Sequence, residues 1–217
     1  MVDINNVTLS SDRNEIELKL NEGTIKGFEY KSLNPKLPNF KVFKAVPYAK
    51  PPVGRLRWSP PEPIGQFSSD QIPTDRHRAM CHTDFEDAGV SPDRYREMVD
   101  NGLIDEDCLT VNIFMPSKES TQKRPIVLWF HGGGFSNGAH YPGFGNTDLD
   151  IIFVTVQYRL GLFGFMSTWD EDVEKNVIGG NYGLLDQQQA LSFIHANAEN
   201  LGGDVDRITI IGEIFLF

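Results

Sequence analysis

The sequence predicts an α/β protein, with a mixed β region followed by parallel central strands and a crossover helix. Three short apolar runs in the second half indicate this: residues 126–130, 151–156 and 208–211. They are rich in β-branched residues, as is typical of parallel strands buried on both faces. A helical pattern separates the last two, and the order strand, helix, strand predicts a βαβ crossover.

The first half reads as β structure broken by loops. Residues 15–30 alternate around Asn21-Glu22-Gly23, which predicts a β-hairpin. We expect a loop over residues 31–40 and a short strand over 42–49. The proline-rich stretch 51–63 predicts no regular structure.

The middle of the chain is polar and irregular over residues 70–107, with one helix expected near 94–99. A strand is expected at 109–114. The crossover helix is expected over residues 184–200, because apolar residues recur on one helical face and two glycines follow. The face consists of Leu184, Leu191, Ile194 and Ala198, and the glycines are Gly202 and Gly203.

Composition indicates one globular domain. The chain has 217 residues, of which 40% are hydrophobic and 23% charged, with a formal net charge of −10. The acidic balance argues against nucleic acid and against anionic membranes as partners. No apolar run approaches the roughly 20 residues of a membrane span. The oligomeric state is left open.

Localisation also stays open on the residues alone. Residues 1–21 lack the apolar core of a signal peptide, which favours the cytoplasm. Cys81 and Cys108 fit either one disulfide or two buried thiols. The sequon Asn6-Val7-Thr8 matters only in a secreted chain.

Six segments, taken together and in order, resemble the type-B carboxylesterase/cholinesterase family. They are residues 45–58 (Ala-Val-Pro-Tyr-Ala, Pro-Pro-Val-Gly and Leu-Arg-Trp), 106–109 (Glu-Asp-Cys-Leu), 131–135 (His-Gly-Gly-Gly-Phe), 158–165 (Tyr-Arg-Leu-Gly and Gly-Phe), 181–187 and 202–213 (Gly-Gly-Asp to Ile-Thr-Ile-Ile-Gly-Glu). The resemblance implies an α/β-hydrolase fold, serine-dependent hydrolysis of a small carboxylic ester, and no cofactor or metal. On this basis residues 1–217 are expected to form a single partial domain that lacks the C-terminal half.

The glycine run after His131 is the first candidate for chemistry. Backbone N–H groups that face a developing oxyanion stabilise it, and glycine lets the backbone approach closely. The resemblance implies that Gly133 and Gly134 are two of the oxyanion donors. By itself, the run also fits an ordinary glycine-rich turn after a strand.

The end of the sequence departs from the family pattern. The family reads Gly-Glu-Ser-Ala-Gly at the nucleophile elbow, whereas Glu213 is followed here by Ile214, Phe215, Leu216 and Phe217. Isoleucine is no nucleophile, and the triad acid and histidine follow the nucleophile in this fold. We therefore expect a chain truncated at the elbow and inactive by itself. Glu213 matches a gorge-lining position or is simply exposed.

None of the five histidines, at positions 77, 82, 131, 140 and 195, fits a catalytic base. The resemblance implies a Cys81–Cys108 disulfide and two structural ion pairs, Arg57 with Glu106 and Arg159 with Asp186. It also places Met98 where cholinesterases have a tryptophan that stacks on choline. A general carboxylesterase is therefore the better match.

Two other functions are alternatives. One is a non-catalytic binding or adhesion module of the same fold, and the other is a hydrolase with an unusual nucleophile. A further expectation concerns the strand at 208–211. Without a partner on its far side, this apolar, β-branched strand would be an open edge that favours aggregation.

Overall fold

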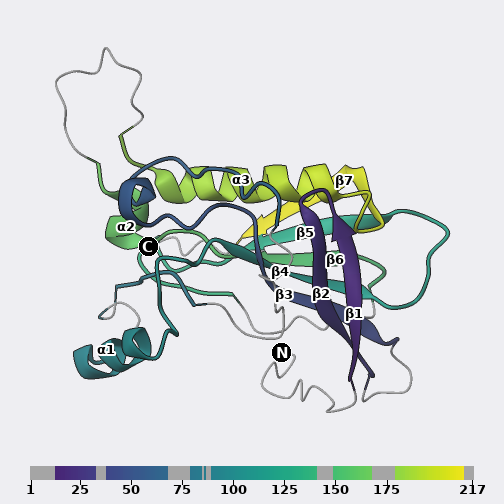
Figure 1. Ribbon diagram of the computed structural model, residues 1–217, viewed down its shortest axis with the longest axis horizontal. Coiled ribbons are helices and arrows are strands. Elements are labelled where there is room, and N and C mark those ends of the chain that lie inside the picture. The colour runs from purple at the N-terminus through teal and green to yellow at the C-terminus, as the bar shows by residue number, and fades with distance from the viewer. Residues whose placement is uncertain are drawn as a thin grey trace.

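The computed structural model describes residues 13–32, 38–67, 79–84, 86, 89–140, 149–167 and 179–212. Within these ranges seven strands form one sheet, in the order β1-β2-β3-β4-β6-β5-β7 (Figure 1). The sheet is mixed: the pairs β1–β2, β2–β3, β3–β4 and β4–β6 are antiparallel, and β5 is parallel to both of its neighbours, β6 and β7. The α/β class predicted from the sequence is confirmed.

The N-terminal hairpin is the one that the alternating pattern predicts. Strand β1 (Arg13–Leu20) pairs antiparallel with β2 (Gly23–Tyr30), and Leu20 lies opposite Gly23 across the turn. Strand β3 (Phe40–Pro47) continues the sheet antiparallel to β2. It begins two positions before the predicted residue 42 and ends at Pro47, because Ala49 forms only an isolated bridge with Pro63.

The buried centre of the sheet consists of β4 (Thr110–Pro116), β5 (Arg124–Phe130) and β6 (Ile152–Val156). Strands β5 and β6 are parallel, and most of their residues are buried, as the apolar runs predict. Both β6 and β7 pair with β5, so the βαβ crossover passes over β5 and joins strands that are not neighbours.

Strand β7 (Gly203–Gly212) differs from its prediction in length and burial. It begins at Gly203 rather than at residue 208, because its polar first half contributes no apolar run. Among the described strands β7 pairs only with β5, and much of it is exposed. The expectation of burial on both faces is therefore wrong for this strand, since it lies at the edge of the sheet.

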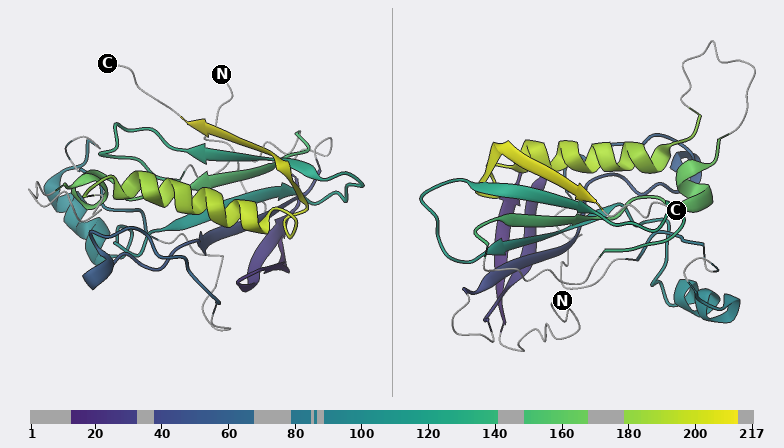
Figure 2. Two further views of the ribbon diagram at one scale, coloured as in Figure 1. Left: turned by 90° about the horizontal axis from the view of Figure 1, so that it is seen from above. Right: turned by 180° about the vertical axis from the view of Figure 1, so that it is seen from behind.

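Helix α3 (Tyr182–Asn197) lies along one face of the sheet, as two views show (Figures 1 and 2). Its buried residues include Asp186, Ala190, Phe193 and Ile194. Leu184 is 44% exposed, so its predicted place on the buried face is wrong. The buried face also includes the polar residues Asp186 and Asn197, which a search for apolar periodicity passes over.

Three short elements complete the part of the fold that the structure describes. Helix α1 (Pro92–Asp100) is capped by the preceding residue, Ser91, whose side chain accepts a hydrogen bond from the Arg94 N–H. It confirms the helix expected near 94–99. Helix α2 (Gly161–Phe165) follows β6. A 3-10 turn at Gly54–Leu56 corrects the expectation of no regular structure in 51–63. None of the described helices is both long and apolar enough to span a bilayer.

We predict that the open β7 edge makes the 217-residue chain self-associate. Ile210 is 53% exposed and Ile211 41% exposed on this edge, and such unpaired strands template further pairing. In sedimentation velocity, Ile210→Lys should shift the chain toward monomer, because a charged side chain on an edge discourages pairing. Leu103→Lys is the control, since Leu103 is 48% exposed in a loop away from the sheet. A monomeric unmodified chain, or an equal effect of the control, would contradict the prediction.

Candidate active site

The carboxyl ends of β5 and β7 place the candidate site. These strands run parallel, with Phe130 opposite Gly212 in their register. We call residues 132–137 the glycine turn. It follows Phe130, the last residue of β5, and His131, and it begins beside the point where β7 ends. Ligand sites in open α/β sheets occur at this end of the strands. Glu213 and Ile214 follow at once and lie outside the described residues.

The glycine turn depends on residues without side chains. Gly133 and Gly134 have positive φ angles of 111° and 59°, a region that glycine adopts readily. The N–H groups of Ser136 and Asn137 both donate to the Gly133 carbonyl at 3.1 Å and close the turn. A Cβ on Gly133 would lie 2.2 Å from the Asn137 carbonyl oxygen, so even alanine would displace the turn.

Gly133 and Gly134 are the two predicted oxyanion donors. Within the described ranges, neither the Gly133 N–H nor the Gly134 N–H donates a hydrogen bond to a protein acceptor. Gly134 is also exposed at the surface. Backbone N–H groups seldom stay unpaired unless water or a ligand can reach them. The turn therefore presents two adjacent donors that a ligand oxygen could use.

His131 contacts the glycine turn at its first residue, Gly132. Its ring stacks on Tyr158, with centroids 4.4 Å apart, and its Nδ1 lies 2.9 Å from the Gly132 carbonyl oxygen. Burial lowers the pKa of His131, which favours the neutral imidazole. The Tyr158 hydroxyl donates to the His131 carbonyl at 2.6 Å, and burial raises the pKa of Tyr158 to about 12. These contacts match the structural role expected for His131.

The other described histidines lie in structural settings. His82 Nδ1 is 3.0 Å from the Tyr95 hydroxyl, and burial lowers the pKa of His82. His140 bridges Thr110 and Thr155 through its two ring nitrogens, each 3.1 Å from a threonine hydroxyl oxygen. His195 is exposed on α3, and His77 lies outside the described residues. His82 and His140 thus contact side chains of other segments, and His195 lies on helix α3.

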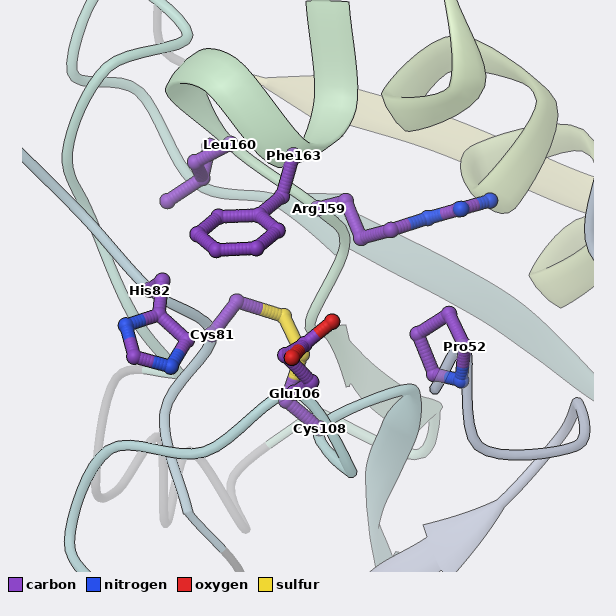
Figure 3. Close-up of a pocket in the computed structure, with 8 residues that line it drawn as sticks. All are labelled: Pro52, Cys81, His82, Glu106, Cys108, Arg159, Leu160 and Phe163. Atoms are coloured by element: carbon purple, nitrogen blue, oxygen red, sulfur yellow. A yellow bond between two sulfur atoms is a disulfide. The ribbon is translucent and has the colours of Figure 1, made fainter. Parts of the chain in front are cut away.

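The two cysteines form one disulfide, which settles the alternative left open by the residues. Cys81 and Cys108 are both 1% exposed and bonded to each other. Figure 3 shows the bond at the centre of a small pocket, between the Phe163 ring, His82 and Glu106. The resemblance to the family implied this pair.

Two ion pairs hold the irregular segments in place. Arg57 donates twice to Glu106, at 2.6 and 2.7 Å, on a partly exposed surface. Arg159 binds Asp186 through two nitrogens, each at 2.7 Å, with both side chains at most 3% exposed. Arg159 also donates to the Arg57 carbonyl at 2.8 Å, so the two pairs are linked. Burial raises the pKa of Asp186, and the bonds from Arg159 oppose that shift.

Sequence reasoning missed the contact between the disulfide segment and the glycine turn. The Thr83 hydroxyl and the Asp84 N–H both donate to the Ser136 carbonyl, at 2.9 and 2.8 Å. Threonine and aspartate in a polar loop carry no signal for such a contact, because the partners lie more than fifty positions apart. Among the described residues, no group of three or more histidines, cysteines or carboxylates could hold a metal ion.

Comparison with known proteins shows the family. The model of the Carboxylesterase family matches residues 13–214. The chain belongs to the carboxylesterase family. Carboxylesterase 1E of Rattus norvegicus is 37% identical over 198 residues, covering 88% of this chain and 34% of the relative. Neuroligin-like protein glit-1 of Caenorhabditis elegans is 38% identical over 192 residues, covering 85% of this chain and 25% of the relative.

The fold of this carboxylesterase-family chain also matches a solved structure. Juvenile hormone esterase from Manduca sexta superposes with a TM-score of 0.72 at 26% identity, covering 92% of this chain and 36% of that one. The sheet is therefore that of the α/β-hydrolase fold. The chain spans about a quarter to a third of the length of these relatives.

Proposed function

We propose that this chain supplies the oxyanion-binding side of a carboxylic-ester hydrolase site. The observation that supports it most is that the N–H groups of Gly133 and Gly134, at the turn beside the end of β7, have no protein acceptor within the part of the chain that the structure describes. Ester hydrolysis places negative charge on the carbonyl oxygen in the transition state. Two fixed donors at that oxygen stabilise the charge. In other enzymes, removal of one such donor raises the barrier by roughly 3–4 kcal/mol.

The substrate class follows from the same chemistry and from the family. A small carboxylic ester has the carbonyl oxygen that the donors require. Met98, which lies in α1, stands where cholinesterases carry a choline-binding tryptophan, and methionine has no π face for a quaternary ammonium. We therefore infer a general carboxylesterase type. One continuous sheet over the described residues supports the assignment of residues 1–217 to a single domain of the α/β-hydrolase type.

We predict that the 217-residue chain by itself does not hydrolyse esters. Ile214 occupies the position of the nucleophile, and the triad residues together provide most of the rate in serine hydrolases. Release of nitrophenol from p-nitrophenyl acetate and butyrate should equal that of a heat-denatured sample. Turnover that an organophosphate abolishes would contradict the prediction, because it would require a reactive serine.

The alternative is a non-catalytic binding module, which Ile214 and the neuroligin-like relative favour. The two proposals differ when a nucleophile is supplied. Residues 1–212 can be joined to the part of Manduca sexta juvenile hormone esterase that follows the structural equivalent of Gly212. If the chain is part of an ester hydrolase, we expect this chimera to hydrolyse p-nitrophenyl esters. A folded chimera without activity would favour the binding module.

A further inference from the structure

The carbonyl of Ser136 connects the glycine turn to the disulfide segment. It accepts from the Thr83 hydroxyl at 2.9 Å and from the Asp84 N–H at 2.8 Å. Ser136 in turn donates its N–H to the Gly133 carbonyl at 3.1 Å, and its hydroxyl to the same oxygen at 3.2 Å. A short path of hydrogen bonds therefore runs from Thr83 to the backbone of Gly133.

The segment that carries Thr83 is itself anchored to the sheet. Cys81 is bonded to Cys108, which lies two positions before β4. Met80 accepts from the Asp105 N–H at 3.0 Å and donates to the Leu103 carbonyl at 2.9 Å, on either side of an isolated bridge to Ile104. The disulfide and these backbone bonds hold the start of the segment against buried structure (Figure 3).

The glycine turn has few other supports. Among the described residues, hydrogen bonds from other segments reach the turn at Ser136 and at Phe135, whose carbonyl accepts from the Gly161 N–H at 2.7 Å. Other contacts of the turn are His131 Nδ1, 2.9 Å from the Gly132 carbonyl oxygen, and the Phe165 ring, 4.9 Å from that of Phe135. The turn has positive φ at three consecutive residues, Gly133, Gly134 and Phe135. Such backbone has other accessible conformations, so contacts from neighbouring segments must select one.

We propose that Thr83 is a positioning residue, which together with the Cys81–Cys108 disulfide sets the geometry of the Gly133 and Gly134 donors. This inference rests on the proposed oxyanion role. Transition-state donors act only when held within about 0.5 Å of the productive geometry. Loss of the Thr83 hydroxyl releases one of the two bonds at Ser136, and loss of the disulfide frees the segment that carries both.

The first test measures the turn itself in the 217-residue chain. Thr83→Val should raise the hydrogen-exchange rate of the Ser136 and Asn137 amides about fivefold, the factor expected for one lost hydrogen bond. Thr83→Ser should restore the original rate, because serine keeps the donor. Thr121→Val, an exposed loop position, is the matched control and should change nothing. Unchanged exchange in Thr83→Val would overturn the proposal.

The second test links the turn to chemistry in the chimera described above. Thr83→Val should lower kcat about tenfold and leave KM within twofold, since the donors act mainly in the transition state. Thr83→Ser should recover kcat, and a valine variant with normal kcat would overturn the proposal. The double variant Cys81→Ala, Cys108→Ala should loosen the same amides further. A folded but inactive chimera, together with altered amide exchange in Thr83→Val, would refute the proposed function but keep the positioning role.

Discussion

Replacing Gly133 by alanine should lower kcat about 10²–10³-fold in the chimera that carries a nucleophile, the loss seen when one oxyanion donor is removed. The physical reason is the crowded turn. A Cβ at this position would lie 2.2 Å from the Asn137 carbonyl oxygen and 2.4 Å from its side-chain oxygen. The turn must open to admit it, and the Gly133 and Gly134 N–H groups then move together.

The control for this variant is Gly102→Ala. Gly102 also has a positive φ, of 67°, but a Cβ there would meet nothing within 4 Å. Alanine at Gly102 therefore brings the backbone strain without the crowding, and this strain lowers the stability by roughly 1–2 kcal/mol. Steady-state kinetics on p-nitrophenyl butyrate should show a normal kcat for Gly102→Ala. A Gly133→Ala chimera with unimpaired kcat would refute the oxyanion assignment.

Replacing Asp186 by alanine should lower the free energy of unfolding by about 3–5 kcal/mol, the range for breaking a buried ion pair. Arg159 would then keep its charge in a site where it is 3% exposed. Asp186 also accepts from the Arg159 backbone N–H at 3.1 Å, and that donor would lose its partner as well. Because Arg159 bonds to the Arg57 carbonyl, the segment around Arg57 should loosen too.

Urea denaturation measures this effect, with Ile210→Lys as the common background to limit self-association. The matched control is Glu15→Ala, which breaks an ion pair to Lys26 whose side chains are 57% and 56% exposed. An exposed ion pair contributes little to stability because water and salt screen the charges, so this control should be nearly neutral. Equal losses for Asp186→Ala and Glu15→Ala would show that burial of the Arg159 pair does not matter.

Much of the sheet could be predicted from local pattern. The hairpin around Asn21-Glu22-Gly23 and the apolar runs of β5 and β6 follow from periodicity and turn chemistry, which act over a few residues. Prediction failed where long-range contacts override local preference. Leu184 has the right spacing for the core of α3, yet it is exposed, because Asp186 faces inward to meet Arg159.

In the candidate site, two features could be predicted from the sequence alone. They are the glycine turn with its two donors, and the isoleucine, Ile214, at the position of the nucleophile. A run of three glycines after a strand and an isoleucine after Gly-Glu can be recognised without coordinates. Only the tertiary structure decided that Thr83 and Asp84 reach Ser136, and that Leu184 is exposed while Asp186 is buried. Contacts between segments distant in sequence depend on how the chain packs, and neither composition nor spacing specifies that packing.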